Sequence, residues 1–339
     1  MKGHIPYRSL DLRYRERFES STNFDNINLI VYHIFCTGDY IDVVTKQINR
    51  LKSSGLYDWC DTLEVTCISL DNNFTEVENI FKGLDKVNLN KYKDNSYEYE
   101  GINKVWEYSQ THSGKVLYFH SKGVSNKYKN KNTQEHSEWK AKGVEFWKEL
   151  MEYYLIDNYT ECLEKLETHD QCGLTLNNNW WWGNFWWSNL SWIKINSKPN
   201  HGDRWYFEAW INYGRNPSGY EFYHFDWNAY YTYFPLDFVI NPNPPYKVNI
   251  KKAYYGTLGE QQDEGRPVVK RSVVDVTDKV INNFKSNEEK RINIRVDNDL
   301  TEKDPAFGVE KYLEVHLDLN EEECILTTSE GQPCKINFE

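Results

Sequence analysis

The sequence predicts an α/β protein, a Rossmann-type sandwich followed by a small antiparallel β domain. From residue 28 onward, apolar runs of strand length alternate with amphipathic helical patterns, which is typical of β-α-β units. The composition changes near residues 241–250, because all 13 tryptophans lie before that point and residues 251–339 contain none. We therefore expect two domains, residues 1–245 and residues 251–339.

The first β-α-β unit has the clearest pattern. Residues 28–36 (NLIVYHIFC) predict a buried strand, and Thr37-Gly38-Asp39 predicts a turn that leads into a helix. Residues 63–70 (LEVTCISL) predict the second strand, joined to the first by a right-handed crossover. The helix between them is indicated by apolar residues at helical spacing, namely Ile41, Val44, Ile48 and Leu51.

Further elements follow along the chain. The predicted order begins with a short strand over 87–89, a helix over 101–109, a buried strand from Val116 (VLYFHSKGV) and a loop over 121–133. Helical residues 134–166, divided at Asp157-Asn158, and a strand over 172–176 follow. A short helix then begins after the cap position Asp203 and ends at Gly214, with Phe207, Trp210 and Ile211 on one face. In the tail, alternating patterns predict strands over 268–276, 291–296 and 312–319.

Composition argues against several classes of protein. The net charge of −11 counts against a non-specific nucleic-acid binder, and no apolar run reaches the roughly 18 residues of a membrane span. The first residues lack the apolar stretch of a secretory signal. The seven cysteines are scattered without C-x-x-C spacing, which favours reduced thiols and counts against a zinc site. We therefore expect a cytoplasmic protein.

Polar residues follow the predicted strands at the point where each ends. In open α/β sheets ligands bind beyond the carboxyl ends of the strands, so these residues are candidates for a ligand-binding edge. An imidazole, a hydroxyl and an ammonium in succession suit an anionic ligand, although a solvated loop is the plainer interpretation. The candidate residues are Thr37, Gly38, Tyr40, Asp71, Glu100, His120, Ser121, Lys122 and Gly123.

The segment 177–192 (NNNWWWGNFWWSNLSW) holds six tryptophans. Each buried indole needs a partner for its N–H group, so we expect some of these rings to line a groove rather than to be buried. A sugar or a nucleotide is the natural ligand of such a groove, and an aromatic cluster wedged between helices is the alternative. The candidate groove residues are Trp181, Trp182, Gly183, Asn184, Trp186 and Trp187.

Two carboxylates near the short helix are candidates for acid–base chemistry. Glu208 suits a general base if it faces an aromatic groove, whereas a solvated ion pair with Arg204 is the structural alternative. Asp203 is a weaker candidate, because it is well placed to cap the helix.

Five segments together resemble a family of microbial and viral glycosyltransferase-like proteins. They are VYHIFCTGDY, INRLKSSGLYDWCDTLEV, LYFHSKGVS, GNFWWSNLSWIK and RWYFEAWI, within residues 28–212. The resemblance implies a GT-A fold and transfer of a sugar from a nucleotide donor. The tail, with VDVT and NDLTEKDPAFGVEKYLEV, resembles a small β module found at the ends of diverse microbial and phage proteins.

The chain departs from the Asp-x-Asp metal motif that many sugar-nucleotide enzymes carry at the end of the fourth strand. His120, Ser121 and Lys122 stand there without a carboxylate, and Asp71 is only a partial substitute. We therefore predict no metal-ligating residues, while Mn²⁺ or Mg²⁺ stays open as a cofactor. His120 and Lys122 would then stabilise the departing diphosphate.

The sequence thus predicts a glycosyltransferase, inverting in its stereochemistry, with a nucleotide-sugar donor and a glycan or other hydroxyl acceptor. Glu208 is the expected base. The alternative is a carbohydrate-binding protein without chemistry, built on a degenerate transferase domain. Nucleotide affinity distinguishes the two, because a pure glycan binder does not use it.

Overall fold

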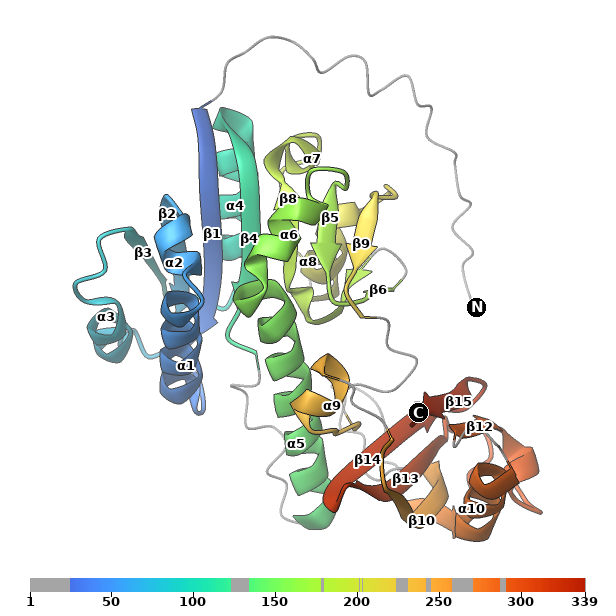
Figure 1. The fold of residues 1–339 in the computed structure, drawn as a ribbon. Coiled ribbons are helices and arrows are strands. Elements are labelled where there is room, and N and C mark those ends of the chain that lie inside the picture. The colour runs from blue at the N-terminus through green and yellow to red at the C-terminus, as the bar shows by residue number, and fades with distance from the viewer. Residues whose placement is uncertain are drawn as a thin grey trace. The chain divides into compact units, whose positions relative to one another are not determined.

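The computed structural model describes residues 25–122, 134–177, 180–200, 202, 204–223, 231–241, 245–257, 271–286 and 291–338 (Figure 1). The chain divides into two compact units, one from residues up to Ser121 together with Tyr154–Phe222, the other from Lys122–Tyr153 together with Tyr223–Glu339. The protein is mixed α/β, with parallel strands in one sheet and further antiparallel sheets. Within the described ranges, no helix is long and apolar enough to cross a membrane. The domain boundary expected at residues 245–251 stays a prediction.

The first unit is built on a seven-stranded sheet with the order β3-β2-β1-β4-β8-β5-β9 (Figure 1). Strands β2 and β4 flank β1 and run parallel to it, and β3 runs parallel to β2. Strand β8 is antiparallel to both β4 and β5. The strands are β1 (Asp25–Phe35), β2 (Thr62–Ile68), β3 (Val87–Tyr92), β4 (His112–His120), β5 (Gln171–Gly173), β8 (Trp186–Asn189) and β9 (Gly219–Glu221).

Four helices lie between the parallel strands along the chain: α1 (Tyr40–Ser53), α2 (Leu56–Trp59), α3 (Thr75–Phe81) and α4 (Tyr99–Thr111). Successive residues of β1 point to opposite faces of the sheet. Tyr32 donates a hydrogen bond of 2.5 Å to Gln47 of α1 and contacts the ring of Phe81 in α3. Val31 belongs instead to the core cluster that contains Ile102 of α4. Helices α1 and α3 thus cover one face of the sheet, and α4 covers the other.

The rest of the first unit consists of short elements. They are the π-helical turn Tyr153–Asp157, which spans the boundary of the two units, α6 (Tyr159–Lys165), β6 (Leu176–Asn177), β7 (Trp180–Trp181), the 3₁₀ turn Trp182–Asn184, α7 (Leu190–Lys194), α8 (Arg204–Ala209) and the 3₁₀ turn Trp210–Asn212. Helix α6 begins directly after Asn158, where the sequence predicts a division. The predicted strand over 172–176 is shorter and shifted, whereas helix α8 begins at Arg204, the position that follows the predicted cap residue Asp203.

The second unit carries an antiparallel sheet with the order β11-β10-β13-β14 and a β12-β15 pair. The predicted strand over 312–319 is confirmed as β13, whereas the helix α10 was not predicted. The elements are α5 (Gln134–Glu152), α9 (Leu236–Ile240), β10 (Val248–Thr257), β11 (Ser272–Asp275), α10 (Thr277–Ser286), β12 (Arg291–Arg295), the 3₁₀ turn Asn298–Leu300, β13 (Tyr312–Leu319), β14 (Glu322–Ser329) and β15 (Pro333–Asn337).

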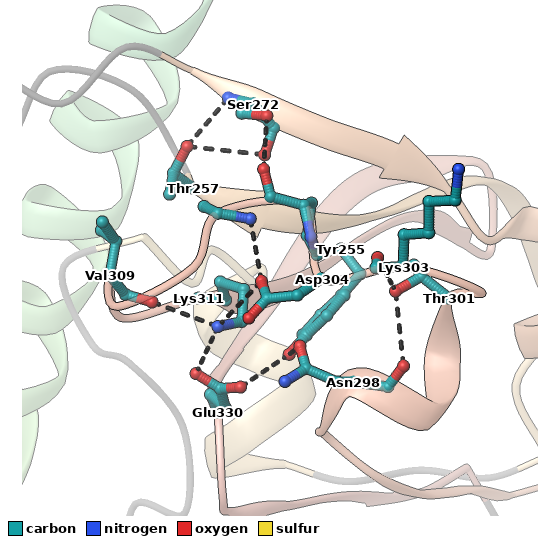
Figure 2. A network of polar contacts seen from close by, with 12 residues as sticks. Tyr255, Thr257, Ser272, Asn298, Thr301, Lys303, Asp304, Val309, Lys311 and Glu330 are labelled. Carbon is teal, nitrogen blue, oxygen red and sulfur yellow. Dashed lines mark hydrogen bonds and ion pairs between the residues drawn. The ribbon is translucent and has the colours of Figure 1, made fainter.

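A buried amine lies at the centre of a polar network in this unit (Figure 2). The side chain of Lys311 is 4% exposed, and its Nζ atom pairs with Asp304 at 3.3 Å and with Glu330 at 3.1 Å. The hydroxyl of Tyr255 lies 3.0 Å from the other carboxylate oxygen of Glu330. Since a buried charge is tolerated only when it is paired and hydrogen-bonded, this network is a structural element of the second unit.

Candidate functional site at the carboxyl edge of the parallel strands

The strand order of the first unit contains a topological switch point. From β1 the chain passes through α1 to β2 on one side, whereas β4 lies on the other side of β1. Ligands of open α/β sheets bind beyond the carboxyl ends of the strands at such a point. The register pairs His33 of β1 with His120 of β4 at this edge. The residues after β1 and β4 therefore occupy the position at which a ligand is expected.

Ser121 joins the ends of β1 and β4. Its N–H group donates to the carbonyl oxygen of His33 at 2.9 Å, and its hydroxyl oxygen accepts from the N–H group of Phe35 at 3.1 Å. Ser121 is 5% exposed, so this hydroxyl is used within the fold. Ser121 therefore shapes the edge rather than presenting a free hydroxyl to a ligand.

His120 connects the same edge to the tryptophan-rich segment. Its Nε2 atom lies 2.7 Å from the carbonyl oxygen of Gly183 and donates to it, since a carbonyl only accepts. The imidazole also packs edge-on against the ring of Phe185 at 5.1 Å. The structure thus brings together His120 and Gly183, which the sequence assigns to two different parts of the site.

His33 is a polar residue of this edge that the sequence analysis missed. Its Nδ1 atom lies 2.9 Å from Oγ1 of Thr66, and only 4% of the residue is exposed. Burial lowers the pKa of His33 to about 4, because the charged imidazolium is poorly solvated there. The imidazole is therefore neutral near pH 7. The signal was available, since a histidine interrupts the apolar run NLIVYHIFC.

The turn after β1 carries three of the predicted ligand-binding residues. The N–H group of Thr37 donates to the carbonyl oxygen of Phe35 at 2.9 Å. Gly38 is exposed and adopts a φ of 55°, a left-handed conformation that glycine reaches without strain. Tyr40 then begins α1 and is half-buried. This turn exposes backbone at the carboxyl end of β1, as a phosphate-binding loop requires.

Asp71 and Glu100 lie at the ends of neighbouring elements. The Asp71 carboxylate accepts from the hydroxyl of Ser69 at 2.5 Å and from the N–H group of Asn73 at 3.0 Å, and these hydrogen bonds lower its pKa. Glu100 accepts from the hydroxyl of Ser96 at 3.3 Å. Both carboxylates have intramolecular partners that hold them in place.

Two thiols meet beside this edge. The sulfur atoms of Cys36, which follows β1, and of Cys67 in β2 are 3.1 Å apart. Cys36 is partly exposed, whereas Cys67 is buried. The hydrogen bond from the Cys67 thiol lowers the pKa of Cys36 and outweighs the effect of burial. Cys36 is thus an accessible thiol with raised thiolate content.

The tryptophan-rich segment is more deeply buried than predicted. Trp181 is 1% exposed, and Trp186 and Trp187 are fully buried. Each indole N–H finds an acceptor inside the protein, at 2.8 to 2.9 Å: Gln171 Oε1, Asn184 Oδ1 and the carbonyl oxygen of Leu155, respectively. The expectation that these three rings line a groove is therefore corrected, because a fully buried ring presents no face to a ligand.

The turn between the two aromatic clusters is also part of the core. Gly183 and Asn184 are buried and have φ values of 75° and 54°. Trp182 is half-buried and is the one ring of the predicted groove that stays partly accessible in the described structure. The residues predicted to line a groove are thus mostly core residues, and the Gly183 carbonyl among them contacts His120.

Glu208 of α8 lies close to β4. Its carboxylate pairs with Nε of Arg204 at 3.3 Å, and 16% of the side chain is exposed. Burial chiefly, followed by the charges of Glu98 and Glu208, raises the pKa of Tyr118 well above its usual value. Tyr118 precedes His120 by two residues in β4. The ion pair with Arg204, expected as the structural alternative, is present.

The remaining predicted residues are Asp203, Gly123 and Lys122. Asp203 and Gly123 lie outside the described residues. Lys122 belongs to the second unit, where its amine lies 4.6 Å from the centre of the Trp147 ring. The described residues contain no group of three His, Cys, Asp or Glu side chains arranged to hold a metal ion.

A hollow in the second unit has a different chemistry. Its volume is about 370 Å³, and its lining mixes three lysines with two aspartates around the start of α10: Lys251, Lys252, Asp275, Val276, Thr277, Asp278, Lys279 and Leu300. Lys251 pairs with Asp318 at 2.8 Å, and Lys279 donates to the carbonyl oxygen of Asp299 at 3.1 Å. These two amines already have partners within the protein, so the sheet edge of the first unit remains the main candidate site.

Comparison with known proteins gives one family. No curated protein and no solved structure matches the chain. The model of the family described as "Domain of unknown function (DUF8361)" matches residues 29–211, which is more than half of the chain and includes both the switch point and Glu208. The chain therefore belongs to the DUF8361 family.

Proposed function

We propose that the protein is a glycosyltransferase that moves a sugar from a nucleotide-sugar donor to a glycan or another hydroxyl acceptor, on a first unit of the GT-A type. The observation that carries the proposal is the switch point between β1 and β4. Four parallel strands in the order β3-β2-β1-β4 end there in an exposed glycine turn and a fixed imidazole. This arrangement suits the phosphate groups of a nucleotide.

The reaction needs a base and a stabilised leaving group. The acceptor hydroxyl attacks the anomeric carbon, its proton passes to a carboxylate, and the bond between that carbon and the diphosphate oxygen breaks. Glu208 is the proposed base, because its carboxylate is partly exposed and lies near Tyr118 of β4. His120 is the proposed electrostatic partner of the diphosphate. The participation of Lys122, of Asp203 and of Mn²⁺ or Mg²⁺ stays a prediction.

The variant Glu208→Gln tests the base. It keeps the size of the side chain and removes its basicity, so transfer should fall by at least about 100-fold while nucleotide binding is retained. Release of nucleoside diphosphate measures the transfer, and a thermal shift measures nucleotide binding. Asp42→Asn is the matched control, because Asp42 also pairs with a cation four residues away in a helix but is 64% exposed in α1. Unchanged turnover in Glu208→Gln removes this residue from the mechanism.

The carbohydrate-binding alternative is favoured by one observation, the exposed aromatic side chains of α8 and the turn that follows it. Trp205 is 56% exposed and Tyr213 is 72% exposed. A protein that uses these rings alone would bind saccharides and would not respond to nucleotides. Nucleotide affinity therefore separates the two functions.

A further inference from the structure

Two exposed aromatic rings in the first unit lie outside the predicted groove. Trp205 in α8 is 56% exposed, and its ring centre is 6.2 Å from that of Trp180 in β7, with an angle of 36° between the planes. Tyr213 is 72% exposed and contacts the ring of Tyr206 at 6.4 Å. Because the Trp205 ring lies beside that of Trp180, the two form a continuous aromatic surface rather than an isolated exposed side chain, and such surfaces can mark binding sites.

The Trp180–Trp205 pair differs from the other tryptophans of this region in its hydrogen bonding. The indole N–H groups of Trp192 and Trp210 donate to carbonyl oxygens of Ile211 and Ser197, at 3.3 and 3.1 Å. Within the described residues, the indole N–H groups of Trp180 and Trp205 have no such acceptor. These two rings therefore offer both a stacking face and a donor to a ligand.

Tyr206, which contacts Tyr213, is itself held by several contacts. The hydroxyl oxygen of Tyr206 accepts from the N–H group of Asn200 at 3.2 Å. Gly202 brings its backbone so close to Tyr206 that an added Cβ atom would lie 2.9 Å from the ring. Tyr206 also packs edge-on against the buried Phe207 at 5.2 Å.

Arg204 contacts both Trp205 and the proposed base, Glu208. Its guanidinium lies 5.6 Å from the centre of the Trp205 ring, and its Nε atom pairs with Glu208 at 3.3 Å. Among the described residues, the charges of Arg204 and Glu208 thus compensate each other, and the surface combines aromatic faces with hydrogen-bonding groups. This is the chemistry that recognises a neutral polyhydroxylated ligand.

We propose that Trp180, Trp205 and Tyr213 form a saccharide-binding platform that receives the acceptor as a neutral oligosaccharide. From Trp205 to Tyr213 the chain runs through α8 and the 3₁₀ turn Trp210–Asn212 over roughly 14 Å, at about 1.5 and 2.0 Å per residue, which suits several sugar rings better than one. The role of the platform as the acceptor surface rests on the proposed transferase function, whereas saccharide binding itself does not.

Direct binding of four probes to the full chain tests the platform: maltohexaose, cellohexaose, chitohexaose and α-mannohexaose. At least one should change the intrinsic tryptophan fluorescence in a saturable way. Trp205→Ala should weaken that binding about tenfold, because a stacking face and an N–H donor are lost together. Tyr213→Ala should weaken it less. Phe307→Ala is the control, since Phe307 is 92% exposed in the second unit and should not matter.

Three results would contradict the proposed platform. The first is no binding of any probe, and the second is unchanged binding by Trp205→Ala when circular dichroism shows an intact fold. The third is conversion of a dimer to a monomer by that variant. The last result would show that a second copy of the chain covers the rings. Nucleotide binding, measured in parallel, keeps the two proposals apart. Saccharide binding that depends on Trp205 without any nucleotide response supports the platform and contradicts the transferase.

Discussion

Burial of an imidazole at the carboxyl end of β1 should make stability depend on pH. The pKa of His33 is about 4 in the folded chain, below the roughly 6.5 of an unfolded histidine. As the pH falls from 6.5 to 4, the unfolded chain binds a proton that the folded chain does not, so the free energy of unfolding decreases by up to about 3 kcal/mol.

Urea unfolding of the wild type and of His33→Gln, at about pH 7 and about pH 4.5, measures this contribution. The variant should lose less stability than the wild type on acidification, because it lacks the group that charges on unfolding. It should be somewhat less stable at about pH 7 if glutamine does not replace the contact with Thr66. Equal acid sensitivity of both proteins would show that His33 is already charged in the fold.

The thiol pair at the ends of β1 and β2 predicts selective alkylation. Cys36 is partly exposed, and the Cys67 thiol lowers its pKa by hydrogen bonding, so Cys36 should react with iodoacetamide near neutral pH. Cys60 is the internal control, because it is buried and burial raises its pKa to about 11. Cys67→Ala should slow alkylation of Cys36, as followed by peptide mass spectrometry. Equal rates at Cys36 and Cys60, or no effect of Cys67→Ala, would contradict this assignment.

At the scale of elements, the contact of α4 with the sheet depends on a glycine. A Cβ atom added to Gly101 would lie 2.9 Å from Cε2 of Tyr118 and 3.1 Å from Cβ of His33. Gly101→Ala should therefore destabilise the protein by about 1–3 kcal/mol, although alanine favours a helix by up to about 1 kcal/mol. Chemical denaturation measures the change. Glu107→Ala on the exposed side of α4 should stay within about 0.5 kcal/mol, and an equally stable Gly101→Ala would mean that α4 is not packed as closely as described.

Local pattern predicted the elements whose apolar residues recur regularly. Strands β1, β2 and β13 and helix α1 fall within a few residues of their predicted positions. Strand β4 begins at His112, four residues before the apolar run, because residues 112–115 pair with residues 25–28 of β1. That pairing is a long-range contact, which no local pattern reports. Helix α10 was missed for a different reason: Val280, Ile281 and Phe284 recur at helical spacing, but the tail was interpreted as all β.

The candidate site shows the same limit of sequence-based prediction. The residues after β1 and β4 were predicted because strand ends can be read from the sequence, and the structure places Thr37, His120 and Ser121 along one edge. The burial of Trp187 was not predictable, since its N–H acceptor is a carbonyl 32 residues away. The exposure of Trp205 was not predictable either, because the sequence RWYF alone does not show which ring points outward.

At the scale of the whole molecule, the two units differ in what their chemistry offers. The first has parallel strands that end at a switch point, and Glu208, whose side chain is 16% exposed, belongs to the same unit. The second has antiparallel sheets and a buried ion network around Lys311. The DUF8361 match lies over residues 29–211, which hold the whole switch point. The proposed transferase function therefore concerns the first unit, and the role of the second unit stays a prediction of binding or stability.

Nucleotide binding at the switch point is the central claim, and a thermal shift of the full chain measures it most directly. The panel is UDP, GDP, TDP and CMP with their sugar conjugates, with and without Mn²⁺, and the matching nucleosides are controls that lack phosphate. A ligand at 100 times its Kd stabilises the folded state by about 2.7 kcal/mol, which is a readily measured rise in Tm. The account predicts such a rise with one nucleotide and little with its nucleoside. An unchanged Tm across the panel, with stabilisation by oligosaccharides alone, would contradict it and favour a carbohydrate-binding protein.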